Sequence, residues 1–128
     1  MGARRAVKVV DASAILAVML GERGEEKAAN ALVDGGVSVV NLTEVLQRLV
    51  RTGASPEGVA LRLERGGVQW DRPTDEDAEL VGRWSAIRGF SLADRFCVAA
   101  AKRLSAPVVT ADRDWAGFGL PVQIEFIR

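Results

Sequence analysis

Short valine-rich runs alternate with segments of helical pattern along the chain, and this alternation limits the folds that the chain can adopt. The runs are continuously apolar, which is typical of strands that are covered on both faces in a parallel sheet. Five strands are expected, at Val7–Asp11, Val37–Val40, Val68–Trp70, Pro107–Thr110 and Val122–Phe126. The sequence therefore predicts an α/β fold of three layers, in which a central parallel sheet of four to five strands lies between helices.

Capping residues and glycines mark the helices between these strands. Asn41 or Thr43 is expected to cap the third helix, and Ser91 with Asp94 resembles a capping box before the last. The chain has 128 residues, of which 48% are apolar, so one domain spanning 1–128 is expected. Helices are expected at about Ser13–Leu20, Glu25–Asp34, Asn41–Arg51, Pro56–Arg65, Thr74–Arg88 and Ser91–Leu104, with one turn at Arg113–Ala116.

The charge and cysteine content exclude several classes of function. Lysine plus arginine equals aspartate plus glutamate, 17 against 17, so binding to nucleic acid would need a local basic patch. The single cysteine, Cys97, excludes an internal disulfide, argues against a cysteine metal site and is typical of a reducing cytoplasm. The apolar run Ala12–Leu20 is far shorter than the roughly 20 residues that span a bilayer, so no membrane segment is expected.

Four acids lie where predicted strands end or predicted helices begin. Asp11 ends the first strand, while Glu44 and Asp112 follow the second and the fourth. The carboxyl ends of parallel strands meet at one edge of a sheet, and Asp94 can join them from the first turn of its helix. Carboxylates gathered in this way repel one another and need a counter-ion, for which a hard divalent cation is suited. Because the chain has no histidine, this pattern points to metal-dependent phosphate chemistry.

Each acid also fits an ordinary structural role when it is considered alone. Asp11 is equally suited to cap a helix, and Glu44 is more simply a first-turn glutamate that the helix dipole favours. Asp94 fits a capping box, while Asp112 and Asp114 fit a loop. Only the joint placement of the four acids at one edge favours a functional site.

The four acids lie in the segments Val9–Ser13, Asn41–Leu46, Ser91–Asp94 and Val109–Asp114. In this order, the four segments resemble the motifs of PIN-domain nucleases. The compact length resembles in particular the VapC-type toxins of toxin–antitoxin pairs. The resemblance implies a PIN-like fold and an endoribonuclease that depends on Mg²⁺ or Mn²⁺. The implied catalytic residues are Asp11, Glu44, Asp94 and Asp112, of which Asp11, Asp94 and Asp112 would hold the metal.

The resemblance also implies how the site would work. Ser13 and Thr110 would orient carboxylates by hydrogen bonds, and Asp114 would be an auxiliary acid. A metal-bound water would attack the phosphate and leave a 5′-phosphate end, so that no nucleophilic side chain is needed.

The implied partners are RNA, a VapB-like antitoxin whose tail blocks the acidic site, and a second copy of the chain in a homodimer. RNA contacts are expected from Arg48, Arg95 and Arg113, although each is more simply a solvated surface residue. Arg95 follows Asp94 at a position where the family more usually has a small residue.

Three other classes of protein share parts of this pattern. A catalytically weak PIN-like RNA-binding module would keep the fold without turnover. A phospho-acceptor receiver domain needs paired acids near the first strand and a lysine after the fifth, but no lysine follows Lys102. A phosphatase of the haloacid-dehalogenase type needs a second aspartate two residues after Asp11, where Ser13 stands.

Overall fold

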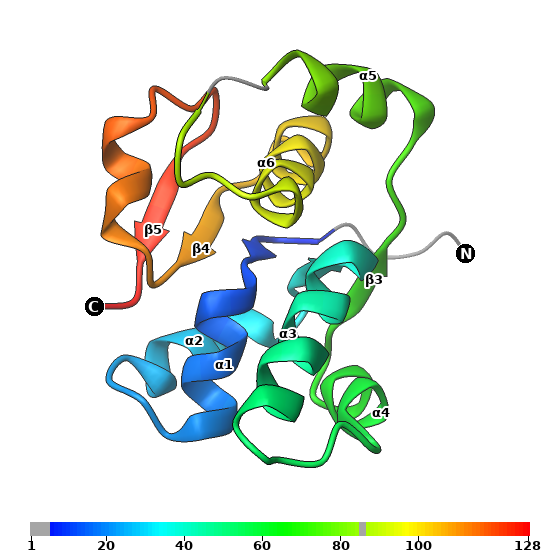
Figure 1. Ribbon diagram of the computed structural model, residues 1–128, viewed down its shortest axis with the longest axis vertical. Coiled ribbons are helices and arrows are strands. Elements are labelled where there is room, and N and C mark those ends of the chain that lie inside the picture. Colours follow the sequence, from blue (N-terminus) through cyan, green and yellow to red (C-terminus); the bar gives the residue numbers. More distant parts are fainter. Residues whose placement is uncertain (1–5, 85–86) are drawn as a thin grey trace.

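The computed structural model describes residues 6–84 and 87–128, which form a five-stranded sheet with the order β3-β2-β1-β4-β5 (Figure 1). Every neighbouring pair of strands is parallel. The predicted α/β fold with a parallel sheet is therefore confirmed. The strands are β1 (Val9–Val10), β2 (Gly36–Ser38), β3 (Gln69–Asp71), β4 (Val108–Thr110) and β5 (Ile124–Phe126).

Helices cover both faces of the sheet, as the three-layer prediction requires (Figure 1). Val10 and Val109 pack into a core with the first four helices, whereas Val9 and Val108 pack into a second core with α6. This division follows from the alternation of side chains along a strand. None of the helices in the described part of the chain is long and apolar enough to cross a membrane. They are α1 (Ala12–Leu20), α2 (Glu25–Leu32), α3 (Val39–Arg51), α4 (Val59–Arg65), α5 (Asp75–Arg83) and α6 (Leu92–Leu104), followed by the 3₁₀ helix η1 (Arg113–Gly117).

The start of α3 differs from the sequence-based expectation. The second strand was expected over Val37–Val40, but it ends at Ser38, which caps α3 by accepting a hydrogen bond from the backbone N–H of Val40 at 3.3 Å. The predicted caps Asn41 and Thr43 are therefore wrong, since both lie inside the helix. A run of β-branched residues favours a strand locally, and here the buried serine ends it.

Other helix ends differ by a few residues. Asp11, and not Ser13, caps α1. The capping box of Ser91 and Asp94 is present at α6. Helix α5 ends at Arg83, and the expected continuation to Arg88 crosses positions 85–86, which lie outside the described residues.

The strand order places a topological switch point between β1 and β4. From β1 the chain builds outward to β2 and β3 on one side, and β4 and β5 complete the other side. Val10 pairs with Val109, and the backbone N–H of Asp11 donates to Val109 O at 2.9 Å. The segments that follow β1 and β4 therefore leave the sheet side by side, at the edge where open α/β sheets bind ligands.

Candidate active site

Asp11 is the most enclosed acid of the candidate site, with an exposed fraction of 2%. Its Oδ2 accepts hydrogen bonds from Ser13 Oγ at 2.6 Å, from Thr110 Oγ1 at 2.8 Å and from the Ser13 backbone N–H at 3.3 Å. The last of these bonds caps α1. Since all three bonds reach one oxygen, Oδ1 remains the atom that can face a cation.

The hydroxyls of Ser13 and Thr110 join Asp11 to the loop that follows β4. Ser13 Oγ accepts from the backbone N–H of Ala111 at 2.9 Å, and Thr110 Oγ1 accepts from that of Asp112 at 3.1 Å. Each hydroxyl gives its one proton to Asp11 and offers a lone pair to the loop. The position of Asp112 is thus linked to that of Asp11.

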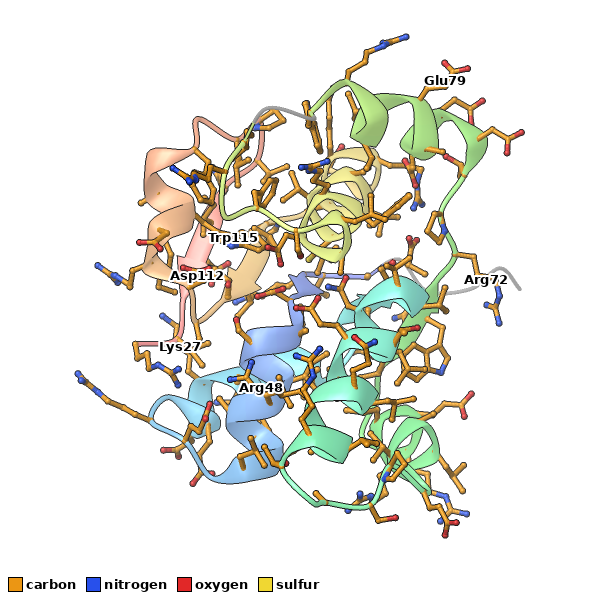
Figure 2. All side chains as sticks on the ribbon, in the orientation of Figure 1. Lys27, Arg48, Arg72, Glu79, Asp112 and Trp115 are labelled. Atoms are coloured by element: carbon orange, nitrogen blue, oxygen red, sulfur yellow. The ribbon has the colours of Figure 1, made fainter. Side chains whose placement is uncertain are left out.

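Asp94 and Asp112 also combine a local capping role with a place near the switch point. Asp94 Oδ2 accepts from the Ser91 backbone N–H at 2.9 Å, and Asp112 Oδ1 accepts from that of Asp114 at 3.0 Å. Figure 2 shows Asp112 at the base of η1, beside the end of β4. The side chain of Asp114 is exposed. In Asp94 and Asp112 the capping bond uses one oxygen and leaves the other for a ligand.

The charges of the four acids act on one another. Burial raises the pKa of Asp11 to about 6, and the charge of Asp94 adds to the rise. The pKa of Glu44 is raised to about 7, mainly by burial and to a smaller extent by the charges of Asp94 and Asp11. The pKa of Asp94 is raised by burial and, to a smaller extent, by the charge of Asp112. Asp94 therefore lies within electrostatic reach of the other three acids.

The donor set fits a hard divalent cation. All four acids offer oxygen ligands, which Mg²⁺ and Mn²⁺ prefer. Glu44 Oε2 is buried without a hydrogen-bond partner, and a bound cation would compensate the cost of burying it. In the described ranges 6–84 and 87–128, no three acidic or cysteine side chains are close enough to form a ready-made metal site.

Two of the three arginines predicted to contact RNA act on these acids. The charge of Arg48 lowers the pKa of Glu44, and that of Arg95 lowers the pKa of Asp94. Arg95 is half-buried, and its Nε is buried without a hydrogen-bond partner. The guanidinium of Arg113 packs on the ring of Phe126 in β5, with 4.6 Å between the guanidinium carbon and the ring centroid, and not on the acids. Arg48 is an exposed residue of α3 and is labelled in Figure 2.

Comparison with known families identifies the fold around this site. Residues 8–119 match the model of the PIN domain. The chain belongs to the PIN domain family. The resemblance seen in the four sequence motifs is thereby confirmed. No curated protein sequence matches this PIN domain.

Several solved structures share the fold of this PIN domain. A toxin–antitoxin complex from Klebsiella pneumoniae has a TM-score of 0.75 at 16% identity, with 94% of this chain and 98% of that chain covered. Mycobacterium tuberculosis VapC20, described as a sarcin–ricin loop cleaving toxin, has a TM-score of 0.70 at 21% identity, with 88% and 95% covered. DNA-bound VapBC from Salmonella typhimurium has a TM-score of 0.68 at 16% identity, with 96% and 99% covered. The TM-scores show a common fold, and at sequence identities this low the similarity shows the fold alone.

Asn41 is a residue of the PIN domain whose place near the site the sequence reasoning missed. It is fully buried in α3, and its Nδ2 donates to the backbone oxygen of Ala93 at 3.4 Å. This bond joins the helix that carries Glu44 to the residue before Asp94. The signal was available, because Asn41 precedes Glu44 by three residues and shares its face of the helix. It was hidden because the helix was expected to begin later than it does.

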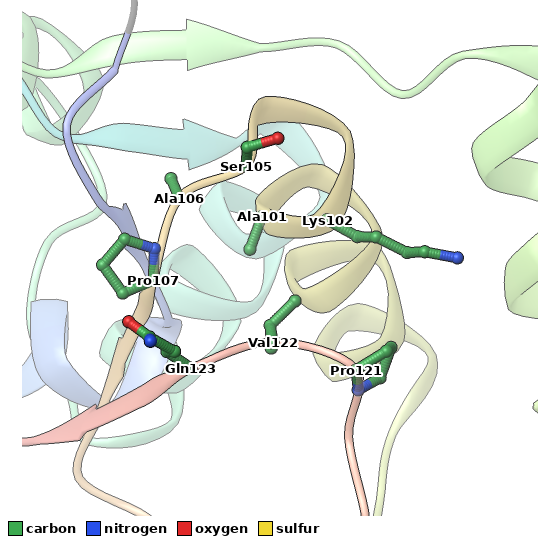
Figure 3. Close-up of a pocket in the computed structure, with 8 residues that line it drawn as sticks. All are labelled: Ala101, Lys102, Ser105, Ala106, Pro107, Pro121, Val122 and Gln123. Atoms are coloured by element: carbon green, nitrogen blue, oxygen red, sulfur yellow. The ribbon is translucent and has the colours of Figure 1, made fainter.

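A cavity lies at the opposite edge of the sheet from the acids (Figure 3). It measures about 280 Å³ and is lined by the end of α6 and by the residues that precede β4 and β5, including Pro107 and Gln123. None of its described lining residues is acidic. Ligands of open α/β sheets bind at the carboxyl ends of the strands, so this cavity is not a candidate for the acidic site.

Proposed function

We propose that this PIN domain is an endoribonuclease that depends on Mg²⁺ or Mn²⁺ and acts as a VapC-type toxin. The observation that carries the proposal is that Asp94 lies within electrostatic reach of Asp11, Glu44 and Asp112 beside the β1/β4 switch point. Membership of the PIN domain family supports a nuclease. The shared fold with VapC20, a toxin described as cleaving the sarcin–ricin loop, supports RNA as the substrate.

Each residue of the site has a role in this proposal. Asp11, Asp94 and Asp112 would hold the cation, with Asp114 as an auxiliary acid. When bound, the cation would stabilise negative charge on the phosphate and make a water molecule more acidic. Ser13 and Thr110 hold the orientation of Asp11.

Glu44 is suited to move a proton in this reaction. Burial and the charges of Asp94 and Asp11 raise its pKa to about 7 in the metal-free protein, and a cation bound beside it would lower this pKa and favour the ionised form that accepts a proton. Because Oε2 has no hydrogen-bond partner, this atom is available to accept a proton from the attacking water. The charges of Arg48 and Arg95 lie near the acids and would reduce the repulsion between them and the RNA phosphates. Arg113 would contact RNA only away from the acids.

The proposal includes the partners of such a toxin. The neighbours from Klebsiella pneumoniae and Salmonella typhimurium are toxin–antitoxin complexes, which supports a VapB-like antitoxin as a partner. An arginine from the antitoxin tail would pair with the carboxylates and block the site. A homodimer and a cytoplasmic location belong to the same proposal.

Removal and return of metal tests the proposed activity. Protein treated with EDTA is expected to leave a mixed RNA pool intact, and Mg²⁺ or Mn²⁺ is expected to restore cleavage that leaves 5′-phosphate ends. Sequencing of the new ends measures both rate and position. Cleavage that persists in EDTA would contradict the metal dependence. RNA binding without cleavage in either metal would support the alternative, a catalytically weak RNA-binding module.

The hydroxyl of Thr110 is expected to matter for metal affinity. Thr110→Val removes the bond to Asp11 and leaves the backbone N–H of Asp112 without its acceptor. Loss of a partner that orients a metal ligand lowers metal affinity by roughly 10–100-fold. A titration of cleavage against Mg²⁺ measures the shift, and Thr110→Ser, which keeps the hydroxyl, is expected to stay near wild type. Equal Mg²⁺ requirements for the valine and serine variants would show that this hydroxyl does not support the site.

A further inference from the structure

A groove beside the acidic site has no part in the function described so far. It measures about 570 Å³ and lies between α3 and the first residues of α6. We propose that this groove holds one nucleotide of single-stranded RNA next to the phosphate that is cleaved. The inference rests on the proposed function, because it assigns a binding position to the RNA substrate of the proposed nuclease.

Glu44 connects the groove to the acids. Its side chain lines the groove and is also coupled to the charges of Asp94 and Asp11. Ala93, on the opposite wall, directly precedes Asp94. If a phosphate of an RNA chain lies at the acids, the neighbouring nucleoside of that RNA would therefore lie in this groove.

The groove follows one face of α3. Val40, Glu44, Gln47 and Arg51 all line it, and their spacing of four, three and four residues places them on one face of the helix. The rise of an α-helix places Arg51 about 10 Å beyond Glu44. This length accommodates a nucleoside together with the phosphate that follows it.

The walls of the groove match the parts of a nucleotide. Leu92, which is 59% exposed, and the half-buried Val40 provide apolar surface for the face of a base. The exposed amide of Gln47 can both donate to and accept from the edge of a base. Arg51 forms no ion pair with any acid in the described part of the chain, so its guanidinium is available to a phosphate.

The size and charge of the groove favour a nucleotide over a second copy of the chain. Its volume lies within the range of roughly 300–1,000 Å³ that is typical of sites for small ligands. A second copy seated there would cover Glu44, which the proposed reaction needs. Arg51, at the far end of the groove, complements the negative charge of RNA. The apolar surface of Val40 and Leu92 thus lies between the cation of Arg51 and the carboxyl group of Glu44.

Binding of a short RNA to the metal-free protein tests the groove without relying on cleavage. The probe is a single-stranded RNA tetranucleotide of mixed sequence, added in EDTA to isotope-labelled full-length protein and followed by backbone amide shifts. We expect shifts at Gln47, Arg51 and Leu92. Leu92→Ala and Gln47→Ala are each expected to weaken binding about five-fold, as loss of an apolar contact to the face of a base or of a hydrogen bond to its edge does. Two exposed helical residues outside the groove provide matched controls, Leu61→Ala and Asn30→Ala, which are expected to bind as wild type does.

The possible outcomes separate this inference from the proposed function. Amide shifts that avoid the groove, or equal binding by the groove and control variants, would overturn the inference. Shifts at the groove that depend on protein concentration without RNA would identify a contact between copies and would overturn it as well. RNA binding in the groove by a protein that cleaves nothing in Mg²⁺ or Mn²⁺ would uphold the groove while refuting the nuclease.

Discussion

Replacement of Asp11 by asparagine is expected to lower RNA cleavage by at least about 100-fold while the protein remains folded. Loss of a partner that only orients a ligand costs roughly 10–100-fold, and loss of a charged ligand is expected to cost no less than the upper end of this range. An asparagine retains an oxygen that can accept the bonds of Ser13 and Thr110. The cap of α1 and the connection to the loop after β4 therefore survive. The measurements are kcat/KM over a series of Mg²⁺ concentrations and the Tm in EDTA.

A matched variant separates the role of Asp11 from a general loss of negative charge. Asp75→Asn removes an exposed aspartate from the first turn of α5 and is expected to cleave RNA as the wild type does. If Asp11→Asn cleaved at the wild-type rate while the metal requirement persisted, Asp11 would not belong to the metal site.

The strands and their acidic ends could be predicted because short segments of the sequence are sufficient to indicate them. A valine-rich run that ends in an acid, as at Asp11, indicates a buried strand whose last residue leaves the sheet. The parallel arrangement predicts that Asp11 and Asp112 lie at the same edge of the sheet, and the observed pairing of β1 with β4 makes them neighbours. The approach of Asp94 from the opposite helical layer follows from the same topology.

The start of α3 could not be read from local pattern. The valines after Ser38 favour a strand locally, and the helix begins there because the buried Ser38 caps it. The role of Asn41 depends on this decision, because its bond to Ala93 requires α3 and α6 to be packed together. The position of Arg113 against Phe126 is likewise a tertiary contact, which adjacency to Asp112 in the sequence does not indicate.

The local and the functional interpretations of the acids prove to be compatible. Asp11 and Asp112 each cap a helix through one carboxylate oxygen, and Asp94 uses one oxygen to complete the capping box with Ser91. The hydrogen bond to the first oxygen fixes the orientation of the carboxylate and therefore also the position of its second oxygen. A capping signal in the sequence is therefore weak evidence against a ligand role, since a cap can hold a carboxylate in place before a cation binds.

Glu44→Gln is expected to stabilise the metal-free protein at pH 8 and to lower RNA cleavage by about 100-fold or more, the contribution typical of a general base. Burial and the neighbouring acids raise the pKa of Glu44 from 4.5 to about 7. A pKa that is higher in the folded state means that ionisation destabilises the fold, so stability falls as the pH rises from about 4.5 through about 7. Glutamine carries no charge and avoids this loss.

The pH dependence makes this prediction specific. Because Glu44 is partly exposed and screened by solvent, the gain at pH 8 is on the order of 1 kcal/mol. For a chain of 128 residues this gain corresponds to a Tm about 3–5 °C higher, and the difference is expected to vanish near pH 4. Thermal unfolding in EDTA at the two pH values measures it, with Glu64→Gln on the exposed face of α4 as the control. A Glu44→Gln protein that is less stable than wild type at pH 8 would show that the charge of Glu44 is not repelled by its neighbours. The electrostatic basis of the acidic site would then be lost, because that repulsion is what a bound cation would relieve.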